Sequence, residues 1–115
     1  MQTYTSTLTS ASVERTFNVA DYSDAVIRVS GIWDGNIEFF GTNTGTTYTA
    51  LAVQDLDSTA FTTGVTSEAG ASPSVDTQTF RANVAGLTTL VVKSAAGFSG
   101  SADIVVTIVS NTNAR

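Results

Sequence analysis

The feature that most restricts the fold of this chain is an alternation of apolar and polar residues between Phe80 and Val109. Three runs in this stretch (80–84, 87–93 and 102–109) show the two-residue period that is typical of strands with one buried face. Short glycine-containing turns separate the runs. Close turns between alternating runs favour an antiparallel meander of three neighbouring strands. The expected core side of this meander consists of Phe80, Ala82, Val84, Ile104, Val106 and Ile108.

The rest of the chain repeats this pattern in shorter runs, and no segment has convincing helical spacing. Strands are predicted over 13–19, 25–29, 37–40 and 46–53. Asp34-Gly35 and residues 41–45 carry the turn residues of β-hairpins. Residues 54–75 have a weak pattern, and we expect one short strand near 59–63 inside a connection that crosses between sheets. About eight short strands with glycine-rich turns predict an all-β, jelly-roll-like antiparallel β-sandwich over residues 12–110.

Both ends of the chain are polar. Residues 1–11 are rich in Thr and Ser, and we interpret them as a flexible N-terminal arm that is either frayed or ordered on a neighbouring molecule as an added β-strand. Residues 111–115 form a polar tail. The first residues do not resemble a secretion signal, and no apolar run approaches the roughly 18–20 residues that span a membrane. We therefore expect synthesis in soluble form in the cytoplasm and no membrane partner.

The composition leaves few routes to catalysis or to nucleic acid binding. The 115 residues include no Cys and no His, which removes thiol chemistry and the usual base at neutral pH. Asp55 and Asp57 offer carboxylates to a calcium ion, but the glycine-centred loop of a strong calcium motif is missing. The net charge of −5 repels phosphate. We expect no enzymatic activity, no cofactor, no metal site and no nucleic acid partner.

Several strands carry apolar residues on the face opposite to the expected core. An antiparallel sheet with one solvent-facing side usually keeps that side polar. Two explanations stay open, because this second face is covered either by residues 54–75 or the arm, or by other subunits. The candidates for subunit contact come from this face, the arm and the 61–75 loop, and they are Tyr4, Leu8, Phe40, Phe61, Val91, Val105 and Val109.

A second candidate surface lies around Trp33, which is the only tryptophan. The neighbouring residues Asp34-Gly35-Asn36 offer polar groups to a sugar on which the indole ring could stack. Tyr48 is the other aromatic candidate for such a glycan site. A lone Trp beside a hairpin also commonly covers the end of a core, and burial of Trp33 would exclude the glycan site.

The C-terminal stretch resembles a known family. Residues 80–108 read FRANVAGLTTLVVKSAAGFSGSADIVVTI, which is similar to the C-terminal part of small jelly-roll or β-sandwich modules in virion structural proteins of tailed bacteriophages. Upstream, residues 33–39 (WDGNIEF) and the 41–51 hairpin resemble another segment of these modules. The resemblance covers residues 25–109. Val92-Lys93 departs from it, because the middle strand of such modules carries an Arg-rich alternation.

This resemblance implies a role in a phage particle. Such modules serve as capsid decoration (cement) proteins or as parts of neck, tail and fibre proteins, and a chain that holds one module fits decoration best. The implied partners are the major capsid protein and further copies of the chain, as a dimer or trimer at symmetry positions, and the implied location is the outer capsid surface of the virion. The alternative is a tail, neck or fibre-associated module that binds host surface glycans.

Overall fold

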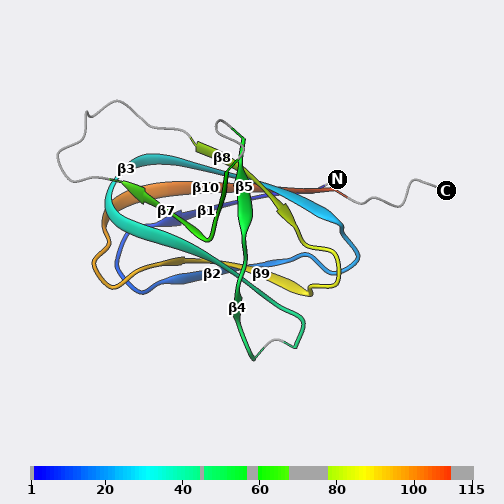
Figure 1. Cartoon of the computed structure of the whole chain (residues 1–115). Coiled ribbons are helices and arrows are strands. Elements are labelled where there is room, and N and C mark those ends of the chain that lie inside the picture. Colours follow the sequence, from blue (N-terminus) through cyan, green and yellow to red (C-terminus); the bar gives the residue numbers. More distant parts are fainter. Residues whose placement is uncertain (1, 45, 57–59, 68–77, 110–115) are drawn as a thin grey trace.

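The computed structural model describes residues 2–44, 46–56, 60–67 and 78–109. Within these ranges every regular element is a β-strand, and the strand pairs are antiparallel (Figure 1). No helix that could cross a membrane occurs among these residues. The all-β prediction is confirmed, with ten strands in the described part where about eight were expected. They are β1 (Gln2–Leu8), β2 (Glu14–Asn18), β3 (Asp24–Thr42), β4 (Thr49–Ala50), β5 (Val53–Asp55), β6 (Phe61–Thr62), β7 (Gly64–Ser67), β8 (Gln78–Asn83), β9 (Thr89–Ser94) and β10 (Ser99–Val109).

The strands form two layers that share the 19-residue strand β3. In the first, called layer A, the strand order is β1-β10-β3-β8-β5-β6. In the second, called layer B, β2 pairs with β9, and β9, β4 and β7 pair with β3. Residues 24–34 of β3 pair in layer A and residues 35–42 pair in layer B. One long strand thus joins the two layers of a sandwich into a single hydrogen-bonded sheet (Figure 1).

β3 contains the Asp34-Gly35 pair that the sequence predicted as a hairpin turn, and this prediction is wrong. β3 pairs with β10 up to Asp34 and with β7 from Gly35 onward, so the chain bends without reversing. Gly35 has a φ of 105°, and a Cβ there would lie 3.0 Å from the Cα of Phe98. Glycine at this point permits both the bend and the close approach. The hairpin expected after residue 41 is present, since Ala50 in β4 pairs with Phe40 in β3.

The three C-terminal strands occupy the predicted positions, but they do not form the predicted meander. β8 and β10 lie in layer A on opposite sides of β3, and β9 lies in layer B. The turns at 84–88 and 95–98 therefore carry the chain from one layer to the other. Alternation identifies the buried face of a strand but not its neighbour in the sheet. A short turn can join two neighbouring strands of one layer or two strands in different layers.

The core lies between the layers and is built from the alternating positions. All six residues predicted for the core side of 80–109 are buried. Phe39 of layer B and Phe80 of layer A join the layers, with ring centroids 5.4 Å apart. Burial of a large apolar side chain contributes about 1.5–3 kcal/mol, so this core holds the two outer faces in fixed positions.

Residues 2–8, which the sequence assigned to a flexible arm, form β1 at the border of layer A. All seven residues of β1 are in register with β10 of the same chain. Leu8 is fully buried, and Tyr4 packs on Phe17 with ring centroids 6.0 Å apart. These inward-facing side chains anchor the segment in its own sandwich, a feature that its Thr-rich composition conceals. The predicted polar tail, 111–115, lies outside the described residues.

The 54–75 region crosses between the layers, as predicted. β5 and β6 pair in layer A, whereas β7 pairs with β3 in layer B. The short strand expected near 59–63 corresponds to β6. Residues 57–59 and 68–77 lie outside the described part of the chain.

Candidate interaction surface

The described residues bring together no set of reactive side chains. They contain no group of three or more His, Cys, Asp or Glu side chains that could hold a metal ion. Asp55 lies at the end of β5, and Asp57, the other carboxylate considered for calcium, lies outside the described residues. The candidate binding surfaces are therefore the two outer faces of the sandwich.

Trp33 does not form the glycan platform considered from the sequence. It is 4% exposed and belongs to the hydrophobic core, because the odd-numbered positions of β3 face inward. Its indole Nε1 is buried and has no hydrogen-bond partner among the described residues. An enclosed ring of this kind cannot stack on a sugar. The structure therefore contradicts this part of the glycan hypothesis.

Tyr48, the other glycan candidate, lies on the outer face of layer B. Its ring centroid is 6.4 Å from that of Phe40, and its hydroxyl donates a hydrogen bond to Oε1 of Glu14 over 3.3 Å. Phe40 is in β3 and Glu14 in β2, and β9 runs between these strands, so Tyr48 reaches across β9. Val91 of β9 lies directly opposite Phe40 and is fully buried. We infer that Tyr48 covers this apolar position, for which the sequence had left open cover by the 54–75 region or the arm, or by other subunits.

The environment of Tyr48 also changes its ionisation. Loss of water around the phenol, followed by the charge of Glu14 and the hydrogen bond to it, raises the pKa of Tyr48 above its usual value of 10.0. A phenol is protonated at neutral pH even at its usual pKa, so the Tyr48 hydroxyl is the donor to Glu14.

Four of the seven predicted contact residues are not available for contact in the way expected. Leu8 and Val91 are fully buried, so these two predictions are wrong. Tyr4 is half-buried and turns inward onto the core. Phe40 is half-buried and packs against Tyr48. Outward direction in a strand is therefore no guarantee of an open surface, because a neighbouring loop can cover it.

The other three predicted residues, Phe61, Val105 and Val109, share one surface. Phe61 is 70% exposed, Val109 is 38% exposed and Val105 is half-buried. The strand register places all three on the solvent-facing side of layer A. This surface is called the outer face of layer A, and it comprises Thr3, Thr5, Thr7, Asp24, Val26, Arg28, Ser30, Ile32, Gln54, Phe61, Thr79, Arg81, Asn83, Ser101, Asp103, Val105, Thr107 and Val109.

Two shallow hollows mark the outer face of layer A. They adjoin each other, because Arg81 in one lies opposite Val26 in the other across β8 and β3. The first has a volume of about 290 Å³ and is lined by Val26, Arg28, Thr79, Val105 and Thr107. The second has a volume of about 300 Å³ and is lined by Asp24, Ala52, Gln54, Phe61, Arg81 and Asn83.

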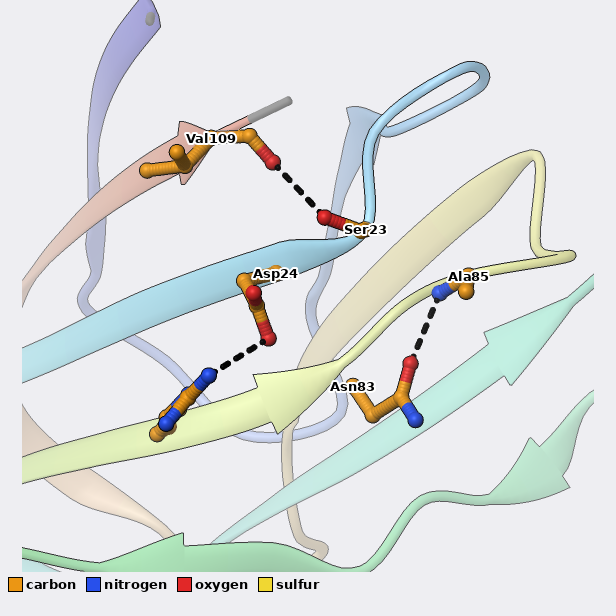
Figure 2. Close-up of polar contacts among 6 residues, drawn as sticks. Ser23, Asp24, Asn83, Ala85 and Val109 are labelled. Carbon is orange, nitrogen blue, oxygen red and sulfur yellow. Dashed lines mark hydrogen bonds and ion pairs between the residues drawn. The ribbon is translucent and has the colours of Figure 1, made fainter. Parts of the chain in front are cut away.

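Polar contacts fix one end of this face (Figure 2). Arg81 and Asp24 form an ion pair across β8 and β3, with Nη2 and Oδ1 3.2 Å apart. The Ser23 hydroxyl donates to the carbonyl of Val109 over 3.4 Å, and Oδ1 of Asn83 accepts a bond from the turn that follows β8. The exposed ion pair adds little stability, but it links β8 to β3, and the bond of Ser23 links the start of β3 to the end of β10. The bond of Asn83 is local to the turn after β8.

Two residues of this face were not predicted as contact residues from the sequence, namely Ile32, which is 57% exposed, and Arg28. Arg28 is exposed, and it forms no hydrogen bond or ion pair with another described residue. Its neighbours across the strands are Val105 and Thr79. The sequence did contain a signal for Arg28, because an arginine at an outward-facing strand position is notable in a chain with a net charge of −5. A guanidinium beside apolar side chains suits a carboxylate on a partner.

Two solved structures have a similar fold. The SPBc2 prophage-derived protein YomS superposes with a TM-score of 0.73 at 14% identity, and the match covers 96% of each chain. The PBSX exported protein XepA superposes with a TM-score of 0.65 at 12% identity. That match covers 93% of this chain and 39% of XepA. No protein-family model and no curated protein sequence matches this chain.

At these identities the likeness establishes the fold. The resemblance to phage β-sandwich proteins is thus supported at the level of the fold, because one of the two similar structures is a prophage-derived protein. The more specific role, decoration of a capsid, is a separate question.

Proposed function

We propose that this protein is a structural component of a phage particle and acts as a capsid decoration protein. In this proposal it is made in the host cytoplasm and binds the outer surface of the head. There it bridges neighbouring major capsid proteins without covalent bonds, catalysis or contact with nucleic acid. The outer face of layer A is the observation that supports this role most strongly.

This face has the physical properties of a docking surface. It is a hydrogen-bonded sheet on a packed core, so it loses little conformational freedom when it binds. Its Val and Thr side chains are stiff, and the exposed ring of Phe61 provides an anchor. Burial of such a surface across the seam between two capsid proteins raises the free energy needed to separate them.

The charged side chains of this face indicate which chemical groups the partner should present. The protein as a whole is acidic. On this face Asp24 pairs with Arg81 and Asp103 accepts a hydrogen bond from Thr7, whereas the guanidinium of Arg28 has no partner among the described residues. An acidic side chain on the capsid protein therefore fits opposite Arg28. The negative charge elsewhere is compatible with a position outside the shell, away from packaged DNA.

The proposal is tested by co-sedimentation with heads of the encoding phage that were assembled without this protein. We expect saturable binding with a fixed number of copies per head, and heads that withstand a higher temperature. Val105→Asp places a carboxylate at the centre of the outer face of layer A, and it should weaken binding at least about tenfold. Thr16→Asp is the matched control, because it adds the same charge on the exposed outer side of β2 in layer B.

Wild-type protein that stays in the supernatant would contradict head decoration. Equal loss of binding in Val105→Asp and Thr16→Asp would contradict the assignment of the contact to layer A.

A further inference from the structure

The outer edge of β1 is an open strand edge. β1 is the first strand in the order of layer A, and among the described residues it pairs with β10 alone (Figure 1). A strand in this position presents a row of peptide groups to solvent, and such a row can bind another strand.

A hydrogen bond at the far end of β10 identifies which peptide groups face this edge. The carbonyl of Val109 accepts a bond from the N–H of Ser23, next to β3, over 3.2 Å. The odd-numbered residues of β10 thus direct their peptide groups toward β3, and the even-numbered ones direct theirs toward β1. In the register of the pair, the even-numbered residues of β10 lie opposite the even-numbered residues of β1. The odd-numbered residues of β1 must therefore direct their peptide groups outward.

Arg15 confirms this direction and closes one end of the edge. Its Nε donates to the carbonyl of Thr7 over 3.2 Å from β2, which lies outside layer A. The N–H and C=O groups of Thr3 and Thr5 have no hydrogen-bond partner among the described residues. The open part of the edge is therefore centred on Tyr4, with one outward-facing residue on each side.

β1 lacks the features that usually protect an edge strand. Its sequence, QTYTSTL, contains no charged residue and no proline. Its register with β10 is continuous, so no bulge turns the edge away. Natural proteins commonly block an edge of this length with a lysine, a proline or a bulge.

We propose that two copies of this chain associate through β1, in antiparallel orientation about a two-fold axis at Tyr4. Thr3 of each copy then pairs with Thr5 of the other. Each of these two pairs exchanges two N–H···O bonds, which makes four in all. Tyr4 lies beside its own counterpart, and the half-buried ring gains a cross-strand contact. The layers A of the two copies form one continuous sheet.

Arg15 selects this register. A two-fold axis at Thr5 would pair Thr3 with Thr7, and it would need the carbonyl of Thr7 that already accepts the bond from Arg15. The axis at Tyr4 leaves this bond intact. The open N–H and C=O groups of Thr3 and Thr5 are arranged symmetrically around Tyr4, so an identical strand satisfies these four groups, which favours a second copy as the partner.

The dimer has a characteristic dependence on salt. A single pair of strands buries less surface than a standard interface, so we expect weak association that increases with protein concentration. Each copy carries a net charge of −5, and the two copies repel each other. Added salt screens this repulsion and should strengthen the dimer, whereas it would weaken a contact held by ion pairs.

Sedimentation velocity across a range of protein and salt concentrations tests the association. Thr5→Pro removes one outward N–H from each copy but no bond between β1 and β10, so it should weaken the dimer at least about tenfold. Thr5→Val keeps the N–H and should dimerise like the wild type. Thermal melting verifies that the variants fold. If Thr5→Pro does not fold, Thr5→Lys replaces it, because it places an ammonium group at the edge and keeps the N–H.

Cross-linking tests the register. The chain has no cysteine, so oxidation of a single-cysteine variant reports only the distance between the two copies. Tyr4→Cys should form a disulfide-linked dimer, because facing residues of a close pair have Cα atoms about 4.5 Å apart. Thr5→Cys should cross-link much more slowly, since its counterpart lies on the diagonal.

A wild-type protein that remains monomeric at all concentrations would overturn the proposal, as would faster cross-linking of Thr5→Cys than of Tyr4→Cys. These experiments use the protein alone, so their outcome does not depend on whether it binds phage heads.

Discussion

Tyr48 shows how a single residue can change the character of a whole face. The aromatic ring and hydroxyl reach Phe40 in β3 and Glu14 in β2, and Val91, which lies between these strands, is fully buried. The outer face of layer B is thereby occupied by the protein's own loop. No period or turn signal in the sequence connects Tyr48 to Glu14, which is 34 residues away.

The raised pKa of Tyr48 gives a prediction that depends on pH. A raised pKa means that the folded state favours the neutral phenol, so the contribution of Tyr48 to stability is complete below pH 10.0 and is lost as the pH rises above it. The difference in phenolate absorbance between the wild type and Tyr48→Phe should therefore titrate above pH 10.0. Glu14→Gln removes the charge and should move this midpoint toward lower pH. A midpoint at or below 10.0 in the wild type would show that Tyr48 is not held against Glu14.

At the scale of elements, the bend in β3 depends on Gly35. Its φ of 105° and the 3.0 Å approach to the Cα of Phe98 both disfavour a side chain. We expect Gly35→Ala to lower the free energy of unfolding by about 1–3 kcal/mol, measured by chemical denaturation. Gly97→Ala is the control from the same region, because a Cβ there would meet no atom within 4 Å. Equal stability of the two variants would refute the role of the bend.

The strands and their buried faces could be predicted from the sequence, whereas their neighbours could not. The positions of β8, β9 and β10 follow from local alternation, and so do the six core residues of this stretch. Their distribution over two layers depends on pairing with β3, whose paired residues lie 47 to 85 positions away in the chain. Asp34-Gly35 was misread for the same reason, because a glycine with positive φ serves a bend as well as a turn.

The candidate surface was predicted only in part. Val105 and Val109 lie on an outer face as expected, and Phe61, which was predicted separately from the 61–75 loop, lies on the same face of layer A. Leu8 was assigned to the outside because its Thr-rich surroundings conceal the inward alternation of β1. Trp33 was a candidate for a glycan site because the polar residues Asp34-Gly35-Asn36 follow it, and its position in the long strand β3 instead places it in the core.

At the scale of the whole molecule, the two outer faces of the sandwich have different capacities for binding. In layer B, Tyr48 packs beside the outward-facing apolar residues. Layer A presents Phe61, Val105 and Arg28, and Arg28 has no partner among the described residues. The open edge of β1 borders layer A as well. A protein with this distribution is suited to bind through one face and to associate with a second copy along one edge.

The most direct measurement is hydroxyl-radical footprinting of the protein free in solution and bound to phage heads. Phe61 on layer A and Tyr48 on layer B are both exposed aromatic residues, at 70% and 38%, so each reports on its own face in the same sample. We predict that binding to heads protects Phe61 from oxidation and leaves the reactivity of Tyr48 unchanged. Protection of Tyr48 with continued oxidation of Phe61 would contradict the assignment of binding to the outer face of layer A.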